Sequence, residues 1–280
     1  MKTVSLFKSS GALNSAPVFS AFEQGLKKYG FNIVYDSMDA DVAVIWSVLW
    51  HGRMANNKLV WEHYRKLDKP VVVLEVGSVQ RSITWRVGVN GISRDSLITR
   101  EFGDYTTQSE HTLLPWRESG EYILICGQND KSLLWKDMPR ASVWISNTIE
   151  QIRNHTDMPI VFRPHPRCTV TGIESYFKNV HRQTPNRLSS TYDSYDLTFH
   201  NAHAVVSWNS SPGSLAVING VPVFTGYDSF AYPVANTDIS DILSPNMPDR
   251  ELWFSEFINS EFTISDMANG MPLKTLTKYI

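Results

Sequence analysis

The chain has 280 residues, of which 42% are hydrophobic and 19% are charged, and this composition is ordinary for a globular protein of one large or two smaller domains. Its formal net charge of −2 argues against a protein that binds nucleic acid indiscriminately. No segment approaches the ~20 consecutive apolar residues of a membrane-spanning helix.

Short apolar runs alternate with helical segments in the first part of the chain. The apolar runs predict strands, and apolar residues at helical spacing predict helices. Strands are expected at 3–7, 32–36, 41–46 and 70–77, and helices at 17–30 and 57–67. Continuous apolar strands between helices are typical of a parallel sheet that is covered on both faces.

A second alternating series follows a less regular region. Residues 78–118 show little periodicity, and 113–122 have the composition of a linker. Strands are then expected at 122–127, 159–165, 179–181, 204–208 and 222–226, with helices at 140–154 and 213–219. Aromatic residues at helical spacing predict one more helix over 249–270.

Two alternating series joined by a linker predict two α/β, Rossmann-like, doubly wound domains that face a cleft. We expect a first domain at 1–118, a second at 119–255 and a C-terminal helical segment at 256–280. In such sheets ligands bind outside the carboxyl ends of the strands. The polar residues that follow each apolar run are therefore the candidates for function.

The cysteines and the N-terminus favour a cytoplasmic protein. The two cysteines, Cys126 and Cys168, lie in or beside apolar runs and are expected to be reduced, buried thiols. The apolar stretch at the N-terminus is too short for a signal peptide. No CxxC, HExxH or EF-hand pattern occurs, so we expect no metal site.

The stretch SWNSSPGSLAVINGVPVF, residues 207–224, places small polar residues between a strand and a helix. Ser210 and Ser211 fall in the N-cap region of that helix, whose free backbone N–H groups favour an anion. Gly213 allows a bulky phosphate to approach the backbone closely. The alternative is a well-capped helix that binds nothing. A Walker A loop is excluded because its lysine is missing.

The stretch VFRPHPRC, residues 161–168, follows an apolar run. Arg163, His165 and Arg167 alternate, and the intervening prolines predict an extended chain with these three side chains on one side. Arginine and histidine side chains donate hydrogen bonds to phosphate oxygens. Ordinary surface ion pairing is the alternative.

Two further strand ends supply candidates. Gly127 and Gln128 follow the first strand of the second domain, where Gly127 offers its backbone, and Gln128 and Asn129 can contact a base or ribose. In the first domain, Glu75 ends an apolar run, where burial would make its carboxylate a useful general base. The alternative for Glu75 is an ion pair with Arg81 or Arg86.

The first half of the chain contains a local basic region. Within residues 81–100 there are four arginines, Arg81, Arg86, Arg94 and Arg100, and one acid, Asp95. His51 and Arg53 follow another predicted strand, and Trp85 and Tyr105 offer stacking surfaces. The alternatives are a solvated, locally paired surface for the charges and core packing for the aromatic rings.

The motifs RPHPR and SWNSSPGSLAVINGVPVF together are similar to the donor-binding part of capsule-polysaccharide and related GT-B nucleotide-sugar glycosyltransferases. Those proteins carry an HP motif, a Ser/Thr-rich turn, a short helix and a Gly-x-Pro-Val strand. The resemblance implies that His165, Ser210, Ser211 and Gly213 hold the phosphates of a nucleotide-diphosphate sugar, such as a UDP-sugar, with no other cofactor. It also implies that the C-terminal helix crosses back to the first domain.

The segment VLEVGSVQRSITWRVGVNGI, residues 73–92, is similar to small glycosyltransferases of tailed phages. Some phage GT-B enzymes glycosylate hydroxymethylated pyrimidines in DNA. This resemblance implies a 5-hydroxymethylpyrimidine, such as 5-hydroxymethylcytosine, as the acceptor, in the host cytoplasm. The acceptor side would then use Arg81, Arg86, Trp85, His51 and Arg53.

The expected reaction is sugar transfer from the donor to an acceptor hydroxyl. Arg163, His165, Arg167 and the helix that begins near Ser210 would stabilise the leaving diphosphate, and Glu75 would deprotonate the acceptor. Three alternatives stay open. They are a transferase that acts on a cell-envelope or capsule glycan, a sugar-nucleotide epimerase of the same fold, and a non-catalytic nucleotide-binding module.

Overall fold

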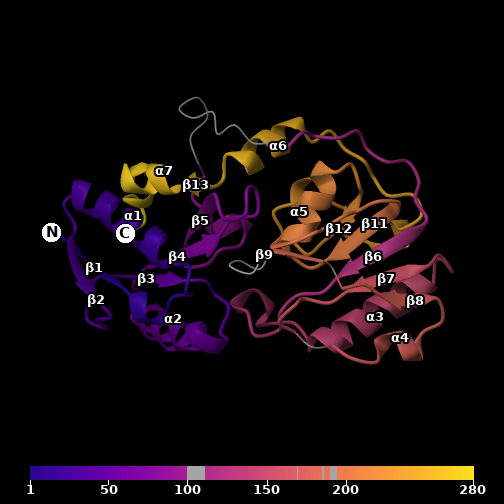
Figure 1. Cartoon of the computed structure of the whole chain (residues 1–280), viewed down its shortest axis with the longest axis horizontal. Helices are drawn as coiled ribbons and strands as arrows, with labels where there is room; N and C mark the ends of the chain where they lie inside the picture. Colours follow the sequence, from indigo (N-terminus) through magenta and orange to yellow (C-terminus); the bar gives the residue numbers. More distant parts are fainter. Residues whose placement is uncertain (100–110, 169, 185, 190–193) are drawn as a thin grey trace. The chain divides into compact units, whose positions relative to one another are not determined.

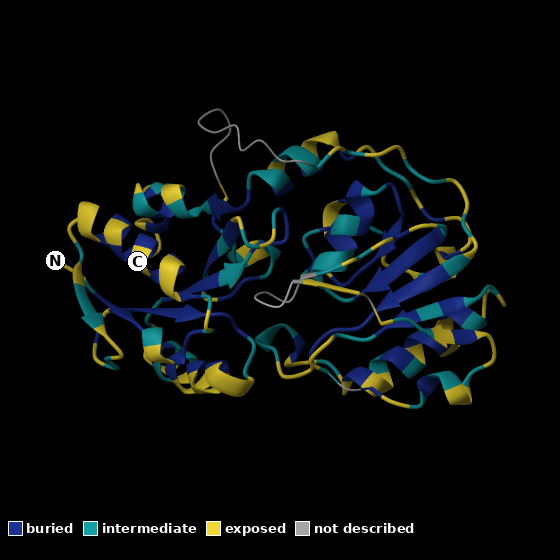
Figure 2. Ribbon diagram, viewed as in Figure 1, coloured by how far each residue is buried: buried dark blue, intermediate teal, exposed yellow. Residues whose placement is uncertain are grey.

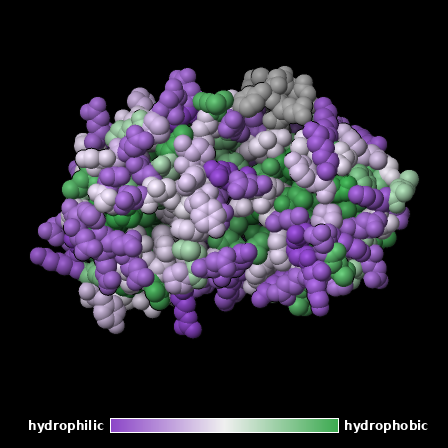
Figure 3. Space-filling view, turned by 180° about the vertical axis from the view of Figure 1, so that it is seen from behind, coloured by the Kyte–Doolittle hydropathy of each residue, from purple (hydrophilic) through white to green (hydrophobic). Residues whose placement is uncertain are grey.

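The computed structural model describes residues 1–99, 111–168, 170–184, 186–189 and 194–280 (Figure 1). The chain divides into two compact units. Unit 1 comprises Met1–Glu110 and Ser255–Ile280, and unit 2 comprises His111–Phe254. In both, the central strands of the sheet are buried and the outward sides of the helices are exposed (Figure 2). The face of the molecule in Figure 3 is mostly hydrophilic, with apolar residues in small groups between.

Unit 1 contains a six-stranded sheet in the order β13-β5-β4-β3-β1-β2. The strands β1 (Thr3–Leu6), β2 (Asn32–Tyr35), β3 (Val42–Trp46) and β4 (Val71–Val76) are parallel. β5 (Thr84–Val89) runs antiparallel to both β4 and β13 (Phe262–Thr263). The parallel sheet expected from the sequence therefore has an antiparallel edge, which β5 and β13 form. Arg86 and Gly88 interrupt the apolar run of β5, which hides the strand in the sequence.

Helices cover both faces of this sheet. α1 (Ala16–Lys28), α7 (Ile264–Ala268) and α8 (Met271–Leu276) share one apolar core with the sheet, and α2 (Asn57–Lys66) packs on β3 and β4 from the other side (Figure 1). At the crossing of α1 and α7, a Cβ on Gly25 would lie 2.4 Å from the carbonyl oxygen of Met267. Glycine therefore allows the two helices to approach closely.

The predicted single helix over 249–270 is wrong. The structure has α6 (Glu251–Ile258), then β13, and then α7. Two local features break the helix. Phe262 and Thr263 pair with β5, and Thr263 starts α7 in a capping box with Asp266.

A buried carboxylate lies between α1 and the first two strands of unit 1. Glu23 accepts hydrogen bonds from Lys27 (2.6 Å), Lys8 (2.5 Å) and Tyr35 (2.9 Å). Burial by itself raises the pKa of Glu23, but these three donors outweigh it and lower the pKa from 4.5 to about 2. The ionised carboxylate therefore stabilises the folded state.

We expect this contribution to be complete above pH 4.5 and to be lost as the pH falls from 4.5 towards about 2, because the folded pKa is the lower one. Urea unfolding of the wild type and Glu23→Gln across this range measures it. The difference between their free energies of unfolding should shrink as the pH falls. A difference that stays constant with pH would show that the charge of Glu23 has no such role.

Unit 2 contains a parallel five-stranded sheet in the order β12-β11-β6-β7-β8. Its strands are β6 (Tyr122–Cys126), β7 (Ile160–Arg163), β8 (Val180–Arg182), β11 (Ala202–Ser207) and β12 (Val223–Phe224), and β9 (Arg187–Ser189) and β10 (Ser194–Tyr195) form a separate hairpin. The helices are α3 (Ala141–Arg153), α4 (Ile173–Tyr176) and α5 (Ser211–Ile218). The chain moves outward from β6 to β8 and then returns to the other side of β6. The strand order therefore reverses between β6 and β11.

The segment expected to be a linker packs on unit 2. The indole N–H of Trp116 donates to the carbonyl of Pro248 (2.8 Å), and Arg117 donates to the carbonyls of Phe199 (2.7 Å) and Ala202 (2.9 Å). The guanidinium of Arg250 stacks 3.7 Å above the Trp116 ring. These contacts fix the segment on unit 2. Across the part of the chain that the structure describes, no helix combines the length and the apolar character needed to span a bilayer.

Candidate functional site

The candidate site lies at the carboxyl edge of the sheet of unit 2, where the strand order reverses. Ser207 of β11, Cys126 of β6 and Arg163 of β7 are aligned across neighbouring strands. The residues that follow them therefore emerge side by side. Burial raises the pKa of the Cys126 thiol to about 11, so this free cysteine stays protonated at neutral pH.

Helix α5 begins at this edge, directly after the loop that follows β11. Ser210 is the N-cap residue with an extended backbone (φ −76°, ψ 150°), and Pro212 lies in the first turn. The Ser210 hydroxyl does not cap the helix. Among the first residues of α5, Pro212 has no N–H group and the N–H of Gly213 donates to the carbonyl of Ser210 (3.0 Å), so the unpaired hydroxyl of Ser210 is the group that this helix start offers to a ligand.

Several buried polar atoms at this edge have no hydrogen-bond partner among the described residues. Ser207, which is 1% exposed, and Thr225, which is 8% exposed, each bury an unpaired hydroxyl. The complete set at this edge is Oγ of Ser207, both amide atoms of Asn209, Oγ of Ser210, Oγ1 of Thr225 and Nη1 of Arg163. An unpaired buried polar group costs about 1–3 kcal/mol, and such groups are normally completed by a ligand or by water.

Two glycines let the backbone segments of the site approach one another. A Cβ on Gly213 would lie 2.7 Å from Oγ of Ser207, so α5 starts directly against the end of β11. The N–H of Gly127 donates to the carbonyl of Arg163 (2.8 Å), and a Cβ on Gly127 would lie 3.3 Å from the backbone nitrogen of His165. The segments after β6, β7 and β11 are thus packed together at one edge.

The segment after β7 differs from its predicted conformation. β7 ends at Arg163, and His165 to Cys168 form a turn in which Nδ1 of His165 accepts the N–H of Arg167 (3.1 Å). The prediction that Arg163, His165 and Arg167 project from one side of an extended strand is therefore wrong. In the neutral ring, an accepting Nδ1 leaves the proton on Nε2.

The three predicted phosphate ligands of this segment have different surroundings. Arg163 is 3% exposed, and its guanidinium donates to Oε1 of Gln183 (2.7 and 3.0 Å) and to the carbonyl of Thr198 (2.8 Å). This leaves only its Nη1 for a ligand. His165 is half-buried at the turn, and Arg167 is exposed.

Two amides connect the loops of the site. Oε1 of the buried Gln128 accepts the backbone N–H of Asn209 at 3.4 Å. Asn129 is also buried, accepts the N–H of Lys131 (2.9 Å) and donates to the carbonyl of Arg167 (3.4 Å). Both side chains therefore help to hold the loops, and Asn129 braces the turn that carries His165.

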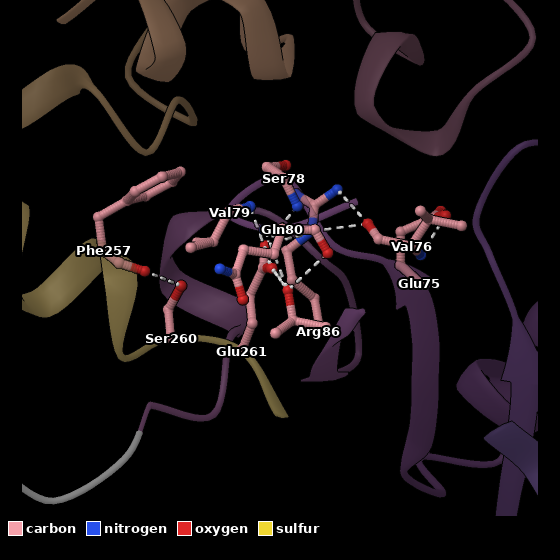
Figure 4. Close-up of polar contacts among 10 residues, drawn as sticks. Glu75, Val76, Ser78, Val79, Gln80, Arg86, Phe257, Ser260 and Glu261 are labelled. Carbon is pink, nitrogen blue, oxygen red and sulfur yellow. Dashed lines mark hydrogen bonds and ion pairs between the residues drawn. The ribbon is translucent and has the colours of Figure 1, made fainter. Parts of the chain in front are cut away.

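In unit 1, Glu75 lies near the carboxyl end of β4, opposite Arg86 on β5 (Figure 4). It is half-buried, and its Oε1 accepts the N–H of the adjacent Val76 (2.8 Å). Arg86 donates to the carbonyl of Val76 and lies 4.0 Å from the carboxylate of Glu261. The acid that pairs with Arg86 thus comes from the C-terminal segment.

The other predicted acceptor residues are also in unit 1. His51 and Arg53 are exposed around the 3₁₀ turn Gly52–Asn56, and Arg81 is exposed in the turn between β4 and β5. Trp85 is 5% exposed and belongs to the core of unit 1, which leaves its ring no free face for stacking. Arg100 and Tyr105 lie outside the described residues.

Sequence reasoning missed Asn209, Thr225 and Glu261. Thr225 follows β12 directly, so the rule that ligands meet the carboxyl ends of strands would have found it. Asn209 lies inside the stretch 207–224, but helix capping points to the serines that follow it. No sequence pattern indicates the role of Glu261, because its hydrogen-bond partners lie far away in the sequence. Among the residues that the structure describes, no group of three or more His, Cys, Asp or Glu side chains is placed to hold a metal ion.

No family model and no curated protein matches the chain. It is similar to solved structures at low identity. The KpsC beta Kdo 2,7 transferase of Thermosulfurimonas dismutans is 13% identical, with 99% of this chain and 100% of that chain covered and a TM-score of 0.50. The KpsC beta Kdo 2,4 transferase of that organism is 11% identical (97% and 98% covered, TM-score 0.46). The UDP-GlcNAc 2-epimerase of Neisseria meningitidis is 12% identical (99% and 100% covered, TM-score 0.35).

Of these three, the 2,7 transferase has the TM-score that bears on the fold, and at 13% identity it bears on nothing else. The predicted fold class is confirmed: the chain is an α/β protein with two Rossmann-like units, as in GT-B proteins.

Proposed function

We propose that the chain is a glycosyltransferase that takes its sugar from a nucleotide-sugar donor, and that the donor binds at the carboxyl edge of the sheet of unit 2. The observation that carries the proposal is the group of buried, unpaired polar atoms around the start of α5. This group lies where the strand order reverses, which is the position at which such sheets bind nucleotides.

The chemistry of this group suits a phosphate. The Ser207, Ser210 and Thr225 hydroxyls and Nη1 of Arg163 can all donate, and phosphate oxygens accept. His165, in the turn after β7, is proposed as a further ligand of the phosphate. Each donor is fixed by a strand end or a helix start, so little reorganisation is needed as charge develops on the leaving group.

In the proposed reaction the acceptor oxygen bonds to the anomeric carbon of the sugar. The bond from that carbon to the phosphate oxygen breaks, and its electron pair stays on the phosphate, where the donors of unit 2 stabilise it. A base removes the proton of the acceptor hydroxyl, and Glu75 is the residue we propose for this step. The sequence position of Glu75 at a strand end and its half-buried carboxylate support this role.

For the acceptor we propose a 5-hydroxymethylpyrimidine in DNA. The support is the resemblance of residues 73–92 to phage glycosyltransferases. The structure adds none, because Arg86 hydrogen-bonds within unit 1 and Trp85 is in its core. The acceptor and the donor are therefore tested separately.

The test is mass spectrometry of products formed from UDP-, GDP- and CMP-sugars, each offered with hydroxymethylated DNA and with ordinary DNA. A sugar mass added only to hydroxymethylated DNA is the expected result. Epimerised donor, which has the mass of the original donor and is identified by NMR of reactions without acceptor, would replace the transferase with an epimerase. If no nucleotide sugar is turned over and none raises the thermal stability, the donor site itself is wrong.

A further inference from the structure

The turn between β4 and β5 of unit 1, residues 77–83, is wrapped around a single carboxylate (Figure 4). Glu261 is 1% exposed, and its oxygens accept the N–H of Ser78 (2.5 Å), the N–H of Val79 (3.1 Å) and the hydroxyl of Thr84 (2.5 Å). Two successive backbone N–H groups that converge on one acceptor form an anion-binding nest. The turn is therefore shaped around a negative charge.

A positive charge and a glycine next to the nest also favour a carboxylate in it. Nε of Arg86 lies 4.0 Å from Oε1 of Glu261 and supplies a positive charge. A Cβ on Gly77 would lie 2.2 Å from Oε2 of Glu261, so a larger residue there would exclude the carboxylate. Glycine, two N–H groups, one hydroxyl and one guanidinium thus meet at the same two oxygen atoms.

We propose that this turn is an anion-binding site whose ligand is the chain's own Glu261, and that Glu261 is a positioning residue that fixes the turn at the carboxyl edge of the sheet of unit 1. A carboxylate that is removed from water is costly unless it is paired and hydrogen-bonded. Packing alone would be served by an apolar side chain of similar size. The carboxylate is needed because the N–H groups of Ser78 and Val79 donate to different oxygens of Glu261, and an amide offers only one acceptor oxygen.

Glu261 connects the turn to the C-terminal segment of the chain. Ser78 and Glu261 are separated by 183 positions in the sequence, and β13 pairs with β5 directly after Glu261. The conformation of the turn, which exposes Arg81 and Ile83, therefore depends on the C-terminal segment. This inference does not rest on the proposed function, because it concerns an occupied site within unit 1.

The test uses the full chain with Glu261→Ala, which leaves room for a small carboxylate. Trypsin cleavage after Arg81 reports the order of the turn, since cleavage follows the population of the open form. We expect cleavage about tenfold faster than in the wild type, because the nest has lost its anion. Formate should restore protection and raise the melting temperature of the variant, and formamide, its neutral counterpart, should not.

The matched control is Glu256→Ala, an exposed glutamate of the same segment, which should behave as the wild type with and without formate. If Glu261→Ala does not fold, Glu261→Gln keeps the volume, and cleavage after Arg81 should again be faster than in the wild type. Restoration by formamide as well as by formate would overturn the proposal. Wild-type protection of Arg81 in whichever of the two variants folds would also overturn it.

Discussion

Replacing Gly213 with alanine is expected to lower the affinity for a nucleotide sugar about 100-fold, or by about 2.7 kcal/mol. The added Cβ would lie 2.7 Å from Oγ of Ser207, a contact that real Cβ atoms essentially never make. Either Ser207 or the start of α5 must move. A site built from fixed donors loses its complementarity when they are displaced by a fraction of an ångström. Isothermal titration calorimetry with the donor found by the product screen measures the effect.

The Ser207→Ala background is the control for this explanation, because it removes the atom that clashes. Ser207→Ala alone should weaken binding about tenfold through the loss of one hydroxyl. Adding Gly213→Ala to it should then cost little more, so the two changes are strongly non-additive. An equal 100-fold loss from Gly213→Ala in both backgrounds would show that the contact with Ser207 is not the cause.

The order of strands and helices was largely readable from the sequence because parallel strands are buried on both faces. Their apolar runs are continuous and stand out, as in β3 and β4. β5 is antiparallel and carries Arg86 and Gly88, so it lacks that signature. β13 has only two residues, and its pairing with β5 depends on the tertiary structure.

The candidate site was only partly readable. The rule that ligands meet the carboxyl ends of strands led to Gly127, Ser210 and Gly213, which the structure places at one edge. The course of the chain after Arg163 was not predictable from alternation, because the ring of His165 closes a local turn. Whether a buried polar atom finds a partner is a tertiary property. The unpaired atoms of Asn209 and Thr225 therefore became visible only in the structure.

The unpaired atoms of Asn209 imply that this residue favours ligand binding and lowers the stability of the folded protein. Both the amide nitrogen and the amide oxygen of Asn209 are buried without a partner among the described residues, so exchanging the two atoms changes nothing. A phosphate only accepts hydrogen bonds, whereas a sugar hydroxyl both donates and accepts. Asn209 is thus suited to a hydroxyl next to the phosphate.

We therefore expect Asn209→Ala to raise the free energy of unfolding by about 1–3 kcal/mol and to weaken nucleotide-sugar binding about 100-fold, with little change in the binding of inorganic phosphate. Asn236→Ala is the matched control, because the buried amide of Asn236 bonds to the carbonyls of Val223 and Asn246 and to the N–H of Asn246. It should destabilise the protein instead. Urea unfolding and calorimetry measure both effects. If Asn209→Ala destabilises the chain as Asn236→Ala does and binds the donor normally, Asn209 is a structural residue and does not belong to the donor site.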